Sequence, residues 1–137
     1  MRAVFADTGY WIAVVNPHDS LHEKARLVSN QLAPCTFVTS EMGLVEMLNM
    51  FAERGEHLRQ AAIATIQAIT NDPSVEAVPQ TRRLFRDACG LYRDRGDKGW
   101  SLTDCASFLI MKERGITDAL THDRHFEQNG YKALLRL

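Results

Sequence analysis

The chain has 137 residues, of which 45% are hydrophobic and 24% charged, a composition typical of one globular domain and not of a disordered segment. Sixteen Lys and Arg stand against seventeen Asp and Glu, and the net charge of −1 excludes a protein that holds nucleic acid through a global positive field. Three cysteines without a Cys-x-x-Cys pair indicate neither a disulfide framework nor a zinc ribbon, and no apolar run is long enough for a membrane helix. We expect one domain over residues 1–137, in the reducing cytoplasm and not in a membrane.

Short apolar runs alternate with helical segments in the first half of the chain. Residues 2–6 have the length of a strand, and Asp7-Thr8-Gly9 separates them from a helical segment over residues 10–15. Ser20 to Glu23 has the pattern of a capping box that opens a second helix, which ends at Pro34. A strand over residues 35–38 is followed by helices over about residues 41–54 and 58–69, with Gly55 closing the first of them.

The second half continues the same alternation. We expect a strand over residues 75–78, a helix from Pro79 to about Arg95, a helix over residues 101–114 and a strand over residues 118–121, with a fifth strand within residues 131–135. Strands that alternate with helices predict an α/β domain with a parallel central sheet flanked by helices.

Four carboxylates are candidates for catalytic or metal-binding residues because of their positions in the predicted elements. Asp7 and Asp123 each follow a predicted strand, and parallel α/β sheets bind ligands at the carboxyl ends of their strands. Glu46 lies in the middle of an apolar helix that we expect to be buried, with Asn49 three residues on and able to orient it. Asp104 lies near the start of another helix.

Each of these acids also has a structural explanation. Asp7 is placed to cap the following helix, and Asp104 is placed to form a capping box with Ser101. Asp123 suits a turn, and Glu46 suits the edge of an apolar face from which it reaches water.

The topology nevertheless brings the four acids toward one edge of the sheet. Carboxylates that converge resist ionising together unless a cation neutralises them, and ligation by oxygen alone suits Mg²⁺ or Mn²⁺ better than zinc. Such a set, without a nucleophilic Ser or Cys beside a base, favours phosphoryl chemistry with metal-activated water. The residues therefore predict a metal-dependent phosphodiesterase or phosphatase.

At these positions the sequence resembles a PIN domain, and in particular the VapC-type ribonuclease toxins of bacterial toxin–antitoxin pairs. Asp7-Thr8 is similar to the opening acid of the family, and Glu46 with Asn49 to its helical Glu-x-x-Asn. Ser101 to Asp104 is similar to its third site, and Thr121-His122-Asp123 followed by Phe126 to its last. The motifs are short, but their order and spacing cover essentially the whole chain.

The resemblance implies strand order 3-2-1-4-5 and cleavage of RNA by water with Mg²⁺ or Mn²⁺, leaving a 3′ hydroxyl and a 5′ phosphate. It implies Asp7, Glu46, Asp104 and Asp123 as the metal and catalytic residues, with Thr8, Asn49, Ser101 and Thr121 as their supporting polar groups. It also implies a small cognate antitoxin and a homodimer. For the dimer contact we expect the apolar surface near Trp11 or the helix over residues 58–69.

The only basic concentration lies in residues 82–98. Arg82, Arg86 and Arg93 fall on one stripe of the predicted helix, which either contacts RNA phosphates or is simply solvated. His122 and His125 are placed to touch a phosphate beside Asp123, whereas His18 and His22 lack the third ligand of a zinc site.

Two other functions stay open. Asp7 after a strand suits an aspartyl-phosphate phosphatase, but Gly9 stands where such enzymes carry a second Asp. The alternative is a catalytically silent PIN-like module that only binds RNA or protein.

Overall fold

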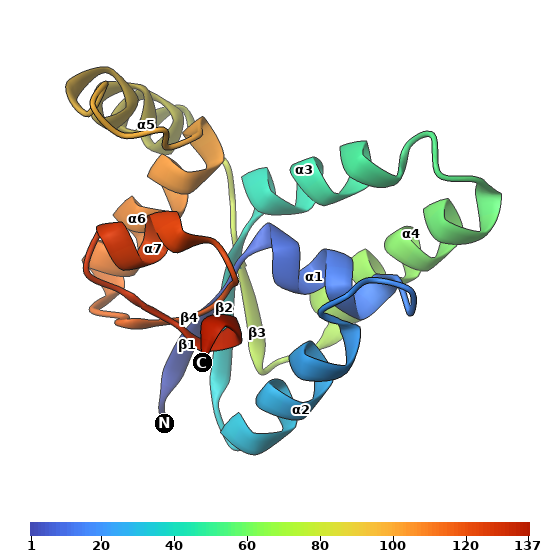
Figure 1. Ribbon diagram of the computed structural model, residues 1–137. Helices are drawn as coiled ribbons and strands as arrows, with labels where there is room; N and C mark the ends of the chain where they lie inside the picture. Colours follow the sequence, from blue (N-terminus) through green and yellow to red (C-terminus); the bar gives the residue numbers. More distant parts are fainter.

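Five parallel strands form one central sheet in the computed structural model, which describes residues 1–137 (Figure 1). The strand order is β3-β2-β1-β4-β5, which confirms the predicted fold class and the order implied by the PIN-domain resemblance. The strands are β1 (Ala3–Ala6), β2 (Thr36–Ser40), β3 (Val75–Val78), β4 (Asp118–Leu120) and β5 (Lys132–Ala133).

Four helices cover one face of the sheet: α1 (Thr8–Val15), α2 (His22–Leu32), α3 (Glu41–Phe51) and α4 (Glu56–Asn71) (Figure 1). They bury an apolar core that includes Trp11, Met47 and Phe51 together with Val4 of β1. The other face carries α5 (Arg82–Asp94), α6 (Leu102–Arg114) and the short α7 (Arg124–Gln128), and a 3-10 turn over Leu134–Arg136 follows β5. None of these helices is both long and apolar enough to cross a bilayer.

Parallel pairing fixes where the functional edge lies. β1 pairs with β4 so that Ala6 is opposite Leu120, and both strands therefore end at the same level. The residues that follow them, Asp7 and Thr121, begin the loops at the carboxyl edge of the sheet. This edge is where parallel α/β sheets place ligands.

Two predicted helix starts are wrong. Ser20 forms no capping box, because Asp19 accepts a hydrogen bond from the Leu21 amide and α2 begins at His22 without a side-chain cap. The predicted start of α5 is also wrong. The helix starts at Arg82 and not at Pro79, because the Thr81 hydroxyl caps it by accepting a hydrogen bond from the Leu84 amide.

Two further elements differ from the sequence-based expectation. α3 ends at Phe51 and not near Arg54. α7, which the sequence did not predict, begins where Asp123 caps the chain by accepting from the His125 amide.

Candidate active site

Asp7 joins β1 to α1 at the carboxyl edge of the sheet. It occupies the N-cap position of α1, but its side chain makes no capping hydrogen bond. Its Oδ2 instead accepts a hydrogen bond of 2.8 Å from the hydroxyl of Thr121, which follows β4. The carboxylate is thus held across two adjacent strands, and helix capping does not explain its presence.

Burial controls the charge of Asp7. The residue is 8% exposed, and loss of hydration raises the pKa of the carboxyl to about 7. The Thr121 hydroxyl opposes this shift in the pKa, whereas the negative charges of Asp104 and Asp123 add to it. Without a cation, Asp7 is therefore about half protonated near neutral pH.

Asp104 is fixed at the start of α6 by a reciprocal capping box. The Ser101 amide donates to Asp104 Oδ2 at 3.0 Å, and the Asp104 amide donates to the Ser101 hydroxyl at 3.0 Å. Asp104 is 7% exposed, and burial is the main cause of a raised pKa. The capping interpretation is correct for this residue, yet the same Oδ2 also faces His125 at 3.1 Å.

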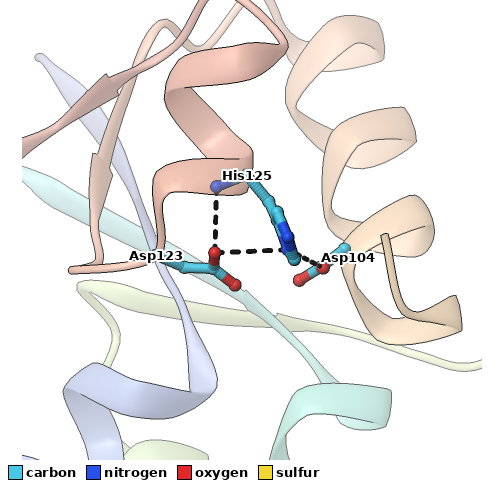
Figure 2. A group of neighbouring side chains, drawn as sticks. All are labelled: Asp104, Asp123 and His125. Carbon is cyan, nitrogen blue, oxygen red and sulfur yellow. Dashed lines mark hydrogen bonds and ion pairs between the residues drawn. The ribbon is translucent and has the colours of Figure 1, made fainter. Parts of the chain in front are cut away.

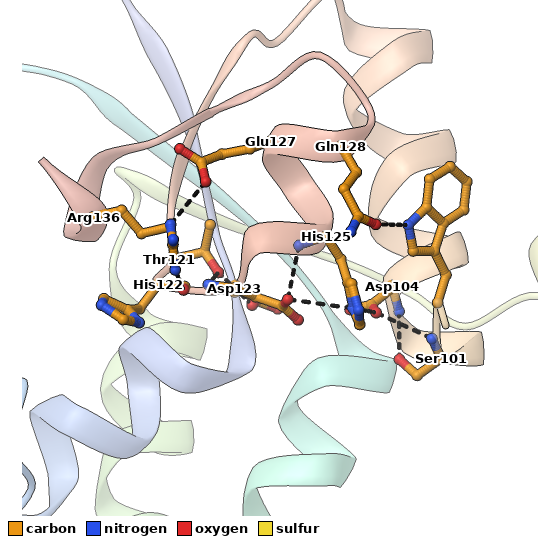
Figure 3. A network of polar contacts seen from close by, with 11 residues as sticks. Ser101, Asp104, Thr121, His122, Asp123, His125, Glu127, Gln128 and Arg136 are labelled. Atoms are coloured by element: carbon orange, nitrogen blue, oxygen red, sulfur yellow. Dashed lines mark hydrogen bonds and ion pairs between the residues drawn. The ribbon is translucent and has the colours of Figure 1, made fainter. Parts of the chain in front are cut away.

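Asp123 follows β4, and the Thr121 hydroxyl contacts it as well as Asp7. The Asp123 amide donates to Thr121 Oγ1 at 3.0 Å, so this one hydroxyl donates to one acid and positions the backbone of the other. Figure 3 shows Thr121 and Asp123 beside the contacts that hold Asp104. Asp123 caps α7, and the turn interpretation is therefore also correct.

His125 lies between two of the acids. Its Nδ1 is 3.1 Å from Asp104 Oδ2 and 3.3 Å from Asp123 Oδ1, and Figure 2 shows the ring between them. From the sequence we expect His125 to contact a substrate phosphate, and its place between two acids is not predicted. The signal that was missed is the spacing, because capping of α7 by Asp123 turns the residue two positions on back toward the acid.

Glu46 is exposed, and the expectation that it is buried is wrong. α3 is not apolar all round: Val45 and Met50 are 50% and 53% exposed, so Glu46 needs no partner to offset desolvation. Glu46 still lines the same cavity as the other acids, because α3 packs against α1. The Thr8 hydroxyl donates to the Gly43 carbonyl at 3.3 Å, and a Cβ on Gly43 would lie 3.1 Å from Thr8 Oγ1.

One cavity collects the four acids. Its lining also contains three of the supporting polar residues and both nearby histidines, but no Lys or Arg. These lining residues are Asp7, Thr8, Glu46, Ser101, Asp104, Thr121, His122, Asp123 and His125. Asn49 is not among them, and it lines a separate hollow between α3 and α4.

The donor set of this cavity suits a divalent cation. One ligand atom from each of Asp104, Asp123 and His125 lies within 4.8 Å of the others. Asp7 is nearly fully buried, and no ammonium or guanidinium group lines the cavity to neutralise it. A hard divalent ion would supply the missing positive charge, and such ions prefer oxygen ligands of this kind.

Comparison with known proteins supports the same interpretation. The 23S rRNA-specific endonuclease VapC20 of two Mycobacterium tuberculosis strains is 27% identical over 128 residues, covering 93% of this chain and 95% of the relative. The crystal structure of M. tuberculosis VapC20, described as a sarcin-ricin loop cleaving toxin, has a TM-score of 0.83 at 26% identity and covers 93% of this chain and 95% of that one. No protein-family model matches the chain.

In sequence and in fold, the chain resembles the VapC type of PIN-domain ribonuclease toxins. The likeness extends over almost the whole length of both proteins, so the VapC assignment applies to the entire sheet and not to one motif. The phosphatase alternative is not supported, because no lysine lines the cavity to hold a transferred phosphate.

The basic stripe of this protein lies on α5, outside the acidic cavity. Arg82 and Arg86 are exposed and line a second hollow with Thr81 and Phe85. Arg93 is exposed as well, but its guanidinium is paired with Asp94 at 2.9 Å. Arg82 and Arg86 are therefore the members of the stripe that are free of ion pairs.

Proposed function

We propose that this VapC-type protein is a Mg²⁺- or Mn²⁺-dependent endoribonuclease whose catalytic centre is the acidic cavity. The observation that carries the proposal is the convergence of Asp7, Glu46, Asp104 and Asp123 on one cavity without a Lys or Arg to neutralise them. When bound there, a divalent ion supplies Lewis-acid activation of the water that attacks the phosphodiester.

The remaining polar groups of the site position these acids. Thr121 orients Asp7 through its hydroxyl proton, and Ser101 holds the Asp104 carboxylate through its amide. Thr8 ties α1 to α3 and so keeps Glu46 close to Asp7. The Asp7 carboxyl must lose its proton to act as a ligand, so metal affinity should increase as pH rises through about 7.

RNA binding is assigned to α5. We expect Arg82 and Arg86, with a smaller contribution from Arg93, to contact phosphates, because phosphate contacts position RNA without reading its sequence. The relative VapC20 is named for action on 23S rRNA, and its structure is described as cleaving the sarcin-ricin loop. We extend this substrate class, a loop of ribosomal RNA, to the present protein.

The toxin assignment also predicts a protein partner, an oligomeric state and a cellular compartment. We propose a small antitoxin that neutralises the enzyme, a homodimeric assembly, and a cytoplasmic site of action. Three free cysteines fit a reducing compartment.

Cleavage of purified ribosomes or total RNA tests the proposal. We expect wild-type protein to produce discrete cleavage with Mg²⁺ or Mn²⁺ and none with EDTA, and Asp7→Asn to produce none in either case. Glu53→Gln, which alters an exposed acid just beyond α3, is the matched control and should cleave as wild type does.

The same assay separates the alternatives. RNA binding without metal-dependent cleavage would identify a silent binding module. Mapped ends that carry a 5′ phosphate support hydrolysis by water, whereas cyclic phosphate ends would contradict it.

A further inference from the structure

The outward face of α5 exposes two aromatic side chains among its arginines. Phe85 and Tyr92 are 44% and 57% exposed and belong to neither apolar core. Two helical turns separate them, so the rings lie about 10 Å apart along the helix axis. At about 100° per residue, both share an arc of about 120° with Arg82 and Arg86.

The opposite face of the same helix packs α5 against the rest of the protein. Leu84, Ala88 and Leu91 pack into the core beneath α5, and Ala88 is fully buried. Phe85 and Tyr92 therefore contribute little to holding α5 in place. Single exposed apolar residues are common, but two rings on one face with unpaired guanidinium groups form a surface of defined chemistry.

The charged side chains of α5 indicate which kind of ligand this surface binds. Arg83 is within 3.8 Å of Asp87, and Arg93 is paired with Asp94, but Arg82 and Arg86 make no ion pair. Both flank Phe85 in sequence and line one hollow with it. Guanidinium groups beside an aromatic face match a nucleic acid strand, which offers phosphates and flat bases at alternating positions.

The position of α5 connects this surface to the acidic cavity. α5 follows β3 at the carboxyl edge of the sheet, which is the edge that carries Asp7. Adjacent strands lie about 4.8 Å apart, so the end of β3, two strands from β1, is about 10 Å from the end of β1. The Gln80 amide also donates to Glu41 at the start of α3, which fixes the beginning of α5 relative to the site.

We propose that the outward face of α5 binds unpaired RNA, with Phe85 and Tyr92 stacking on bases while Arg82 and Arg86 contact the adjoining phosphates. This inference rests on the proposed ribonuclease function and extends it to the form of the substrate. Bases in a duplex are stacked on each other and do not reach the rings, whereas bases in a loop or single strand do. The surface therefore gives the enzyme a preference for unpaired RNA.

Binding measured in EDTA tests the inference without cleavage. The probes are a fluorescein-labelled single-stranded RNA and a fully paired duplex that contains the same strand. We expect Phe85→Ala and Tyr92→Ala each to weaken binding of the single strand by about fivefold or more and to leave duplex binding unchanged. Phe85→Tyr and Tyr92→Phe keep an aromatic ring and should bind as wild type does.

Leu27→Ala is the matched control, because Leu27 on α2 is as exposed as Tyr92, at 57%. A second readout needs no substitution. Cys89 is exposed and lies on α5 between Phe85 and Tyr92, so bound RNA should slow its alkylation. Cys35, before β2, serves as the internal reference and should react at the same rate with and without RNA.

Three outcomes would overturn the inference. Unchanged single-strand affinity in both alanine variants would do so, as would alkylation of Cys89 that RNA does not slow. Loss of a dimer in the alanine variants with unchanged RNA affinity would assign the face to a second copy of the chain. The ribonuclease proposal is judged separately, by metal-dependent cleavage and its loss in Asp7→Asn.

Discussion

Asp7 combines two properties that seldom occur together in a structural residue: it is buried, and its neighbours of like charge oppose its ionisation. Its carboxyl has a pKa of about 7, mainly because burial removes its hydration. Hydrogen bonding by Thr121 does not outweigh that loss. This is the pattern expected of a carboxylate that serves as a cation ligand, and it can be measured.

The stability of the metal-free protein should fall as pH rises from about 4 to about 7. The folded state keeps the Asp7 proton up to about pH 7, whereas the unfolded chain loses it near pH 4, so the folded state binds more protons in between. Asp7→Asn removes this loss of stability, which amounts to as much as about 4 kcal/mol at pH 8, since each pKa unit corresponds to about 1.4 kcal/mol. Urea unfolding in EDTA at pH 5 and pH 8 measures the difference.

Asp104→Asn should also leave the metal-free stability unchanged or raised, because the amide oxygen of Asn still accepts from the Ser101 amide. An Asp7→Asn variant that is less stable than wild type at pH 8 would show that the carboxylate serves as a structural cap.

Metal binding should stabilise the wild type more than its site variants. At about 100 times the dissociation constant, one ion that binds only the native state adds about 2.7 kcal/mol to the free energy of unfolding. Asp7→Asn and Glu46→Gln should gain distinctly less. Thermal melts with Mg²⁺, Mn²⁺ and EDTA measure this gain, with Glu53→Gln as the control. A wild type without any metal-dependent rise would remove the physical basis of the nuclease proposal.

For single residues, the sequence predicted position best where a residue follows a strand. The ends of strands can be located from the sequence, and parallel strands end at the same edge of the sheet. This rule predicts that Asp7 and Asp123 lie at the same edge, and both line the cavity there. Glu46 lines the cavity too, but its burial was predicted wrongly, because the exposure of its apolar neighbours Val45 and Met50 depends on tertiary packing that periodicity does not report. The position of His125 between Asp104 and Asp123 depends on a helix cap that is only visible in three dimensions.

At the scale of helices and strands, the sequence predicted the order of the elements better than their exact ends. The order of the elements followed from alternation, and strands such as β3 were placed to the residue because turn residues bound them. α7 has five residues, too few for a periodic pattern, and was missed. The start of α5 was misplaced because Pro79 and Thr81 both suit a helix start, and the Thr81 side chain provides the cap.

The arginines of α5 should contribute to RNA binding in proportion to their freedom from ion pairs. Replacing Arg82 and Arg86 by Gln should weaken binding similarly for single-stranded RNAs of any sequence. It should lower the slope of log affinity against log salt by about 1.4, since each contact to a single strand contributes about 0.7. Adding Arg93→Gln should lower the slope by less than one further contact, because Asp94 already neutralises that guanidinium. Salt titrations of binding measure these slopes.

Arg83→Gln is the control on the same helix, because Arg83 lies near Asp87 and outside the stripe. An unchanged slope in the Arg82 and Arg86 variant would mean that this face of α5 is only solvated.

At the scale of the whole molecule, the expected homodimer has one remaining candidate surface. Trp11 is 6% exposed and belongs to the core, so the Trp11 side chain itself is not available for a contact and the helix over residues 58–69 becomes the preferred surface. Ile63 of α4 is 46% exposed, and Met50 on the neighbouring helix α3 is 53% exposed. We expect sedimentation at micromolar concentration to give twice the 15.5 kDa of one chain, and Ile63→Asp to give the monomer.

Leu27→Asp, on α2, should leave the dimer intact. A wild type that sediments as a 15.5 kDa monomer would contradict the dimer and leave the enzyme assignment untouched.

The hydrogen bond from Thr121 to Asp7 joins residues that are 114 positions apart, and it has a consequence for the order of synthesis. During translation, the residues of β1, β2 and β3 are added to the chain early, whereas Asp104, Thr121 and Asp123 are added late. Until they have emerged, Asp7 has no hydroxyl partner and the cavity has only two of its four acids. Under the ribonuclease proposal, a ribosome that is translating this protein is therefore not exposed to a finished enzyme while that chain is still being elongated.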